Sequence, residues 1–159
     1  MSLKRIWKLG ILLVALAPVP ANAKWTTTES SQSCFMTVTF VGAQGGSTLS
    51  FLRDYSPNAF LKRNIEMVLT EPQWSEDDGG RIDRSIVIQA EDIQFRAKGL
   101  WSGDSLLIGV DSEHIGIIFN HKTFAVLSGV FVISKFEISI SAKVAYERFR
   151  ACMSRHERS

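Results

Sequence analysis

A serine, an aspartate and a histidine lie close together near the middle of the chain. Ser105 follows Gly103-Asp104, and the stretch Asp111-Ser112-Glu113-His114 begins six residues later. These three residue types can form a hydrolytic triad, in which the serine attacks an acyl carbon, the histidine takes its proton and the aspartate orients the histidine. The set is a candidate for acyl transfer, with Ser105 as nucleophile, His114 as base and Asp111 as its partner.

The same two segments resemble the GDSL and DxxH motifs that name the GDSL-type esterases. This resemblance implies a small esterase in which Ser105, His114 and Asp111 have the roles given above. A structural interpretation also fits, with a hairpin turn at Gly103-Asp104 and a helix N-cap at Asp111 or Ser112. We favour the structural interpretation and expect no catalytic residue and no enzyme activity.

The only two cysteines, Cys34 and Cys152, stand near the two ends of the chain. In an oxidising compartment such a pair forms a disulfide. Closing a loop of about 118 residues corresponds to roughly 4–5 kcal/mol in the chain-entropy model. Metal ligation is the competing interpretation, but zinc needs three or four ligands, and the sequence offers only His114, His121 and His156 with no CxxC. We expect a structural disulfide, no metal site and no cofactor.

Two further groups are weak candidates for a cation. Glu76-Asp77-Asp78 precedes Gly79-Gly80, but it lacks the alternating oxygen ligands of a calcium loop, so a solvated hairpin tip is expected. His114 and His121 are seven residues apart and could share a helix face, but no third ligand is near in the sequence.

Tryptophans and arginines supply the candidate binding residues. Trp74 borders the acidic hairpin, and Trp101 lies between Lys98 and Asp104. Aromatic side chains beside charges are common interface anchors, although partly buried tryptophans at the rim of a core are equally ordinary. Residues 142–159 carry a net charge of +3, which could bind an anionic envelope polymer, phospholipid headgroups or an acidic partner, or could simply complement a helix macrodipole. The arginines concerned are Arg148, Arg150 and Arg155.

The N-terminus has the pattern of an export signal. A basic start is followed by the nine apolar residues 9–17, a Pro-Val-Pro break and Ala21-Asn22-Ala23. Nine helical residues span only about 14 Å, against about 30 Å for a hydrocarbon core, so cleavage after Ala23 is expected in place of a membrane anchor. Cleavage leaves residues 24–159 as one β-rich domain, without a transmembrane segment, in the periplasm or outside the cell. It changes the net charge from +2 to −1, which excludes a polybasic nucleic-acid binder.

Strand signals dominate the rest of the chain. Alternating apolar and polar residues, interrupted by turn clusters, predict an α+β domain that is mainly antiparallel β, as a curved sheet or a small sandwich. A short mid-chain helix and a C-terminal helix pack on it, the latter capped by Ser141 and burying Val144, Ala145, Phe149 and Cys152. Expected strands are 35–40, 48–55, 64–70, 82–89, 92–97 (with Ile93 and Phe95 inward), 106–110, 123–133 and 136–140, and expected helices are 113–121 and 142–153.

The order of these features resembles small exported bacterial proteins of the invasion-associated locus B type. The similarity rests on Trp25 and Cys34 early in the exported chain and on the order of elements from Glu113 to the C-terminus. It implies a β-rich periplasmic or surface domain with a role in host interaction. We therefore expect a non-catalytic domain that binds an unknown protein partner, as an envelope or host-contact factor or as an inhibitor or immunity-type protein. A small-ligand or lipid carrier is an alternative.

Overall fold

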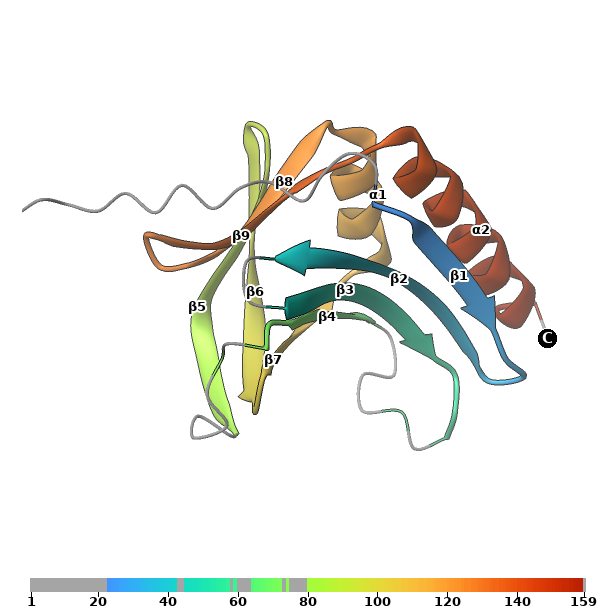
Figure 1. Ribbon diagram of the computed structural model, residues 1–159. Helices are drawn as coiled ribbons and strands as arrows, with labels where there is room; N and C mark the ends of the chain where they lie inside the picture. Colours follow the sequence, from blue (N-terminus) through green and yellow to red (C-terminus); the bar gives the residue numbers. More distant parts are fainter. Residues whose placement is uncertain are drawn as a thin grey trace, which may run out of the picture.

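The strands of this protein form one curled antiparallel sheet (Figure 1). The computed structural model describes residues 23–42, 45–57, 59, 64–72, 74 and 80–158. Within these residues the strand order is β1-β2-β3-β4-β7-β6-β5-β8-β9, and each neighbouring pair is antiparallel. The strands are β1 (Trp25–Glu29), β2 (Ser33–Gly42), β3 (Gly45–Asp54), β4 (Ile65–Thr70), β5 (Arg81–Ala90), β6 (Ile93–Ser102), β7 (Ser105–Val110), β8 (Thr123–Ser128) and β9 (Phe131–Glu137).

Two helices complete the fold. Helix α1 (Ser112–Asn120) follows β7, and helix α2 (Ile140–His156) follows β9. Helix α2 lies alongside β1 and β2 and also contacts α1 (Figure 1). The predicted α+β class, with a mid-chain helix and a C-terminal helix on an antiparallel sheet, is confirmed. Of the two architectures expected, the structure has the curved sheet.

Period-two alternation produces the buried face of the sheet. In β4 the side chains of Ile65, Met67 and Leu69 are fully buried, whereas Glu66 and Val68 between them are partly exposed. Successive side chains of a strand point to opposite faces, so one face joins the core and the other meets solvent. The same alternation recurs in β7.

Aromatic rings from four elements fill the space between the sheet and the helices. Phe119 of α1 lies 5.7 Å from Trp25 of β1 and 5.5 Å from Phe51 of β3, between ring centroids. On α2, Tyr146 stacks on Phe119 at 4.7 Å. Edge-to-face and stacked pairs at these distances add to the stabilisation from burial. These side chains therefore occupy the space between the sheet and the helices.

Strand β1 was not predicted from the sequence. Its residues after Trp25 are three threonines and a glutamate, so it lacks the apolar alternation that marks the other strands. It pairs with β2 on one side, and on the other the Thr27 hydroxyl donates a hydrogen bond to the Ala145 carbonyl of α2 at 3.3 Å. These contacts with β2 and α2 hold β1 in an extended conformation that its own residues do not specify.

The single strand expected over residues 123–133 is wrong, because the chain turns back within it. Gly129 has a φ of +59°, and Gly129-Val130 forms a two-residue turn that joins β8 to β9. Glycine at the first position of such a turn allows the required positive φ. The apolar Val130 and Phe131 concealed the turn, since their side chains suggested a buried strand. The strand expected over 136–140 is consequently misplaced, because β9 ends at Glu137 and Ile140 begins α2.

The C-terminal helix also differs from its prediction. It begins at Ile140, and its N-cap is Ser139, whose hydroxyl accepts a hydrogen bond from the Ala142 amide at 3.2 Å. Ser141 lies inside the first turn and is not the cap. Val144 was expected on the buried face but is 48% exposed. The buried residues of α2 are Ala142, Ala145, Tyr146, Phe149, Cys152 and Met153.

Two predictions in the middle of the chain need smaller corrections. Helix α1, expected over 113–121, runs from Ser112 to Asn120, and it buries Ile115, Ile118 and Phe119. Ile93 was expected to point inward and is exposed, because it is the first residue of β6 after the Glu91-Asp92 turn.

Some predictions lie outside the described residues. These are the export signal up to Asn22 and the acidic hairpin tip Glu76-Asp77-Asp78. Among the described residues, no helix is both long enough and apolar enough to cross a membrane.

Candidate functional site

Ser105 lies at one end of β7, and Asp111 and His114 lie beyond its other end. Ser105 is the first residue of this strand, whereas Asp111 directly follows its last residue and His114 lies in α1. Six strand residues span about 20 Å at roughly 3.3 Å each. A proton cannot pass directly between side chains at that separation, because general-base catalysis needs hydrogen-bond contact. The structure does not assemble the three residues into a triad.

Ser105 has partners outside this set, whereas the side chains of His114 and Asp111 approach each other. The Ser105 hydroxyl donates to the Asp104 carboxylate at 2.9 Å and lies 2.9 Å from the Thr70 hydroxyl of the neighbouring strand. His114 has its Nδ1 3.7 Å from Asp111 Oδ2, and its ring stacks on Phe95 with centroids 4.3 Å apart. Asp111 is the N-cap residue of α1, although its side chain makes no capping hydrogen bond. These contacts join strands, a turn and a helix end.

The structure brings Trp74 and Trp101 together. Their rings are edge to face, with centroids 4.9 Å apart, and both pack against the core. The Arg81 guanidinium lies 5.7 Å from the Trp101 ring centroid, at a distance typical of a cation–π contact. The Trp101 indole N–H points at Asp83 Oδ2 at 3.5 Å. Both tryptophans are half-buried, so much of their surface is already in contact with the core of this protein.

Asp83 anchors the adjoining part of β5 and the base of the β8–β9 hairpin. Its carboxylate accepts hydrogen bonds from the Ser85 hydroxyl at 2.6 Å, the Ser85 amide at 2.8 Å and the Ser128 hydroxyl at 2.7 Å. Burial by itself raises the pKa of Asp83, but the hydrogen bonds from Ser85 and Ser128 outweigh it and lower the pKa to about 2. Asp83 therefore stays ionised at neutral pH and fixes the start of the turn.

The three candidate arginines of α2 have different surroundings. Arg150 forms an ion pair with Glu147 at 3.0 Å within the helix. Arg155 binds Glu29 of β1, with its Nε donating at 3.2 Å, and this hydrogen bond lowers the pKa of Glu29. Arg148 lines a shallow hollow of 410 Å³ on the outer face of α2, together with Lys143, Val144, Glu147 and Ala151. The three side chains do not form one joint site.

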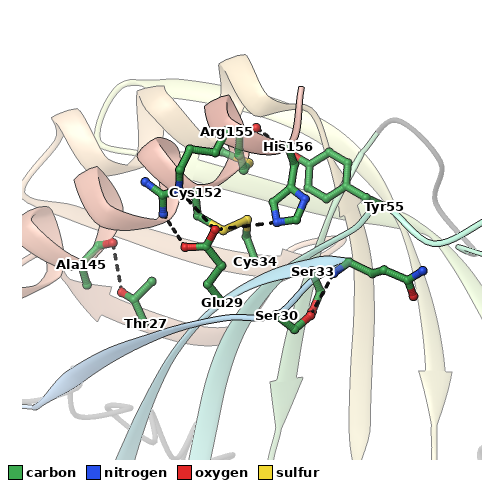
Figure 2. The surroundings of a disulfide bond; sticks show 12 residues. Thr27, Glu29, Ser30, Ser33, Cys34, Tyr55, Ala145, Cys152, Arg155 and His156 are labelled. Carbon is green, nitrogen blue, oxygen red and sulfur yellow. Dashed lines mark hydrogen bonds and ion pairs between the residues drawn. A yellow bond between two sulfur atoms is a disulfide. The ribbon is translucent and has the colours of Figure 1, made fainter. Parts of the chain in front are cut away.

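The predicted disulfide joins Cys34 of β2 to Cys152 of α2, with Cα atoms 5.9 Å apart. Figure 2 shows Glu29, Arg155, His156 and Tyr55 around it. His156 was not singled out from the sequence as a neighbour of this bond. Its spacing of four residues from Cys152 was the available signal, since residues four apart in a helix share a face.

His114 and His121 do not form a metal site with each other. His114 is stacked on Phe95, and His121 has its Nδ1 2.7 Å from the Ile117 carbonyl. In the described part of the chain, the one group of three metal-binding side chains is Cys34, Cys152 and His156.

An exposed apolar cluster at the β8–β9 turn was missed by the sequence analysis. Val130 is 87% exposed, Phe131 76% and Val132 46%, and we call these three residues the hairpin patch. The Gly129 amide donates to the Ser85 carbonyl at 3.0 Å and ties the turn to β5. In Figure 1 this turn projects on the side away from α2. The sequence signal was present in residues 129–131, but it was interpreted as a buried strand.

Strand β9, which begins in this patch, is an edge of the sheet. Within the described residues, β8 is its only partner strand. The opposite edge, β1, is covered by α2 through Thr27 and Glu29. An edge strand presents unpaired backbone groups to which another chain can add a strand.

Comparisons with protein-family models, with curated proteins and with solved structures give no match for this chain.

Proposed function

We propose that this protein is an exported, non-catalytic interaction domain that binds a protein partner through the hairpin patch and the edge strand β9. One observation carries the proposal: Val130 and Phe131 project from a tight turn with 87% and 76% of their surface exposed. Exposed apolar side chains that cluster at one place are characteristic of interaction surfaces.

Burial of these side chains gives the energy for binding. Moving a valine or phenylalanine fully out of water contributes roughly 1.5–3 kcal/mol. Phe131 at the start of β9 can fill a partner's pocket while the backbone of β9 pairs with an extended segment, as in β-strand addition. The expected partner therefore has an apolar pocket next to either the edge strand of a β-sheet or an extended segment.

The base of the hairpin is held in place before binding. Asp83 accepts a hydrogen bond from Ser128, and the Gly129 amide binds the Ser85 carbonyl. A turn fixed at its base loses little conformational freedom when a partner binds, which favours affinity. A hairpin that is fixed at its base and exposed at its tip is better suited to binding a protein than to catalysis.

Export is part of the same proposal. The Cys34–Cys152 disulfide supports an oxidising compartment, because such bonds are rare in the cytosol. The N-terminal pattern and the alanines before Lys24 support cleavage after Ala23. We place the mature chain in the periplasm or outside the cell, as an envelope or host-contact factor or as an inhibitor.

Site-specific crosslinking tests the proposal. A photoreactive phenylalanine analogue is placed at position 131 and, as a matched control, at the exposed position Gln94 of β6. In cells of the source organism, position 131 should give one specific protein adduct and position 94 should not. Phe131→Ser should then weaken binding of that protein by about 10- to 100-fold while Gln94→Ser leaves it unchanged.

Two results would contradict the proposal. Equal crosslinking from positions 131 and 94 would mean that the hairpin patch has no specific partner. An adduct with lipid in place of protein would assign the patch to a membrane surface. Because Phe131 is exposed, Phe131→Ser should fold normally, which an unchanged thermal unfolding curve would verify.

A further inference from the structure

His156 lies directly beside the Cys34–Cys152 bond. One ligand atom from each of these three residues lies within 4.8 Å of the others. The Nε2 atom of His156 is buried without a hydrogen-bond partner, and Glu29 Oε1 is 3.9 Å from it. Figure 2 shows the imidazole between the ring of Tyr55 and the two sulfur atoms. Burying a ring nitrogen without a hydrogen bond costs free energy, so its presence beside the two sulfur atoms needs an explanation.

Two elements, β2 and α2, bring these donor atoms together. Cys152 and His156 are four residues apart in α2, so they share a helix face. Cys34 comes from β2, where it lies opposite Glu29 of β1 in the strand register. Two ligands on one helical turn and a third on a neighbouring strand form a small, largely preset cluster.

Two thiolates and an imidazole are a donor set that zinc prefers. With Zn–S of about 2.3 Å and Zn–N of about 2.0 Å, tetrahedral geometry places the sulfurs about 3.8 Å apart. The sulfurs of a disulfide are about 2.0 Å apart. The Cα atoms of Cys34 and Cys152 are 5.9 Å apart. Once the bond is open, rotation about the side-chain bonds can separate the sulfur atoms by the additional distance of about 2 Å.

We propose that the reduced protein binds one Zn²⁺ through Cys34, Cys152 and His156, so that the disulfide and the metal are alternative states of the same site. In the first step a dithiol reductant is oxidised to its disulfide, and Cys34–Cys152 gains two electrons and two protons to give two thiols. In the second step Zn²⁺ binds both sulfurs and the two thiol protons are released. This inference does not depend on the function proposed above.

The charges around the cluster suit a divalent cation. Two thiolates neutralise Zn²⁺, and the neutral imidazole adds no charge. The neighbouring Glu29 is already paired with Arg155, so the site and its surroundings are close to neutral overall. A neutral site can be buried at a much smaller cost than an unpaired ion.

Cobalt is the spectroscopic probe for this site. The mature protein is reduced with a phosphine, separated from it without oxygen, and titrated with Co²⁺ and then Zn²⁺. The proposal expects one equivalent of Co²⁺ to give a thiolate-to-cobalt charge-transfer band with intense visible bands of tetrahedral cobalt, and one equivalent of Zn²⁺ to remove them. Protein with the disulfide intact should give no such band. A reduced wild-type protein that gives no charge-transfer band overturns the proposal.

Histidine variants test the third ligand. His156→Ala should lose the tetrahedral visible bands and weaken Zn²⁺ binding by more than about tenfold. Replacing a residue that only contacts a metal ligand can already lower metal affinity by that factor. His121→Ala, the matched control, should bind as the wild type does. Should His156→Ala fail to fold, wild-type protein labelled with ¹⁵N at histidine provides the same test: Zn²⁺ must shift a ring nitrogen of His156 and leave His114 and His121 unchanged. Unchanged ring nitrogens of His156 would refute its role as a ligand.

Discussion

The ring of Tyr55 stacks on the imidazole of His156, with centroids 4.8 Å apart and planes inclined by 12°. This pair connects the residue after β3 to the last turn of α2, next to the disulfide. The Tyr55 hydroxyl also donates to the Met153 carbonyl at 3.3 Å. The end of the C-terminal helix is thus held by a covalent bond, a ring stack and a hydrogen bond.

Replacement of Tyr55 separates these contributions. Tyr55→Phe keeps the ring and removes the hydroxyl with its hydrogen bonds to the Met153 carbonyl and Arg53, and it should lower the free energy of unfolding by about 0.5–1.5 kcal/mol. Tyr55→Ala also removes the partly buried ring, with its stack on His156 and its contact with the Arg53 guanidinium, and should cost about 3 kcal/mol. Urea unfolding measures both values. Equal losses in the two variants would show that the Tyr55 ring and its contacts contribute nothing beyond the hydroxyl.

The disulfide should contribute strongly to stability. Replacing both Cys34 and Cys152 by alanine should lower the free energy of unfolding by about 2–5 kcal/mol, because the unfolded chain loses a constraint across a separation of 118 residues. A reductant should destabilise the wild-type protein in urea and leave the double variant unchanged. A reductant effect on the double variant would point to a cause other than this bond.

Gly99 in β6 is required by close packing. A Cβ atom at this position would lie 2.8 Å from Ile86 Cγ1 and 2.8 Å from Leu106 Cδ1, and both of those side chains are fully buried. Gly99→Ala should therefore lower the free energy of unfolding by about 1–3 kcal/mol. In the control Gly46→Ala, the new Cβ meets only Thr39 Cγ2 at 3.8 Å, and a change within about 0.5 kcal/mol is expected.

Asp83 should make the protein sensitive to acid. Its pKa is lowered from 3.8 to about 2 in the folded protein, so its contribution is fully present above pH 4 and is lost as the pH falls from about 4 to about 2. Because Asp83 is partly solvated, the contribution is on the order of 1 kcal/mol. Asp83→Asn should be less stable at pH 7 and lose less stability between pH 4 and pH 2. Parallel stability curves for the two proteins over this range would contradict the assignment.

Cleavage after Ala23 gives a defined mass. Full-length protein expressed in a Gram-negative host should yield a periplasmic chain that begins at Lys24 and contains no free thiol. Intact-mass spectrometry, with and without thiol alkylation, measures both features. Ala23→Leu should block cleavage by removing the small residue before the cut, and processing of that variant at the same position would contradict the predicted site.

Much of the sheet could be predicted because its strands carry their own signal. Alternation in Ile65, Met67 and Leu69 specifies both a strand and its buried face, since side chains alternate across a sheet. The two cysteines left one possible pairing, so the disulfide followed from composition and compartment. The C-terminal helix was recognisable by its spacing, although Ile140 and Val144 obscured its start and its buried face.

The remaining features depend on contacts between distant residues. Strand β1 has a partner on each side and no pattern of its own, and the turn at Gly129 was hidden by the apolar residues that follow it. Whether Ser105 and His114 meet, and whether His156 meets the cysteines, depends on the path of the backbone between them. The sequence by itself determined the residue types and the local alternation, because these act through neighbouring positions along the chain. The separation of Ser105 from His114 follows from the strand between them, but only the tertiary structure placed His156 beside Cys34, because packing brings together residues that are far apart in the sequence.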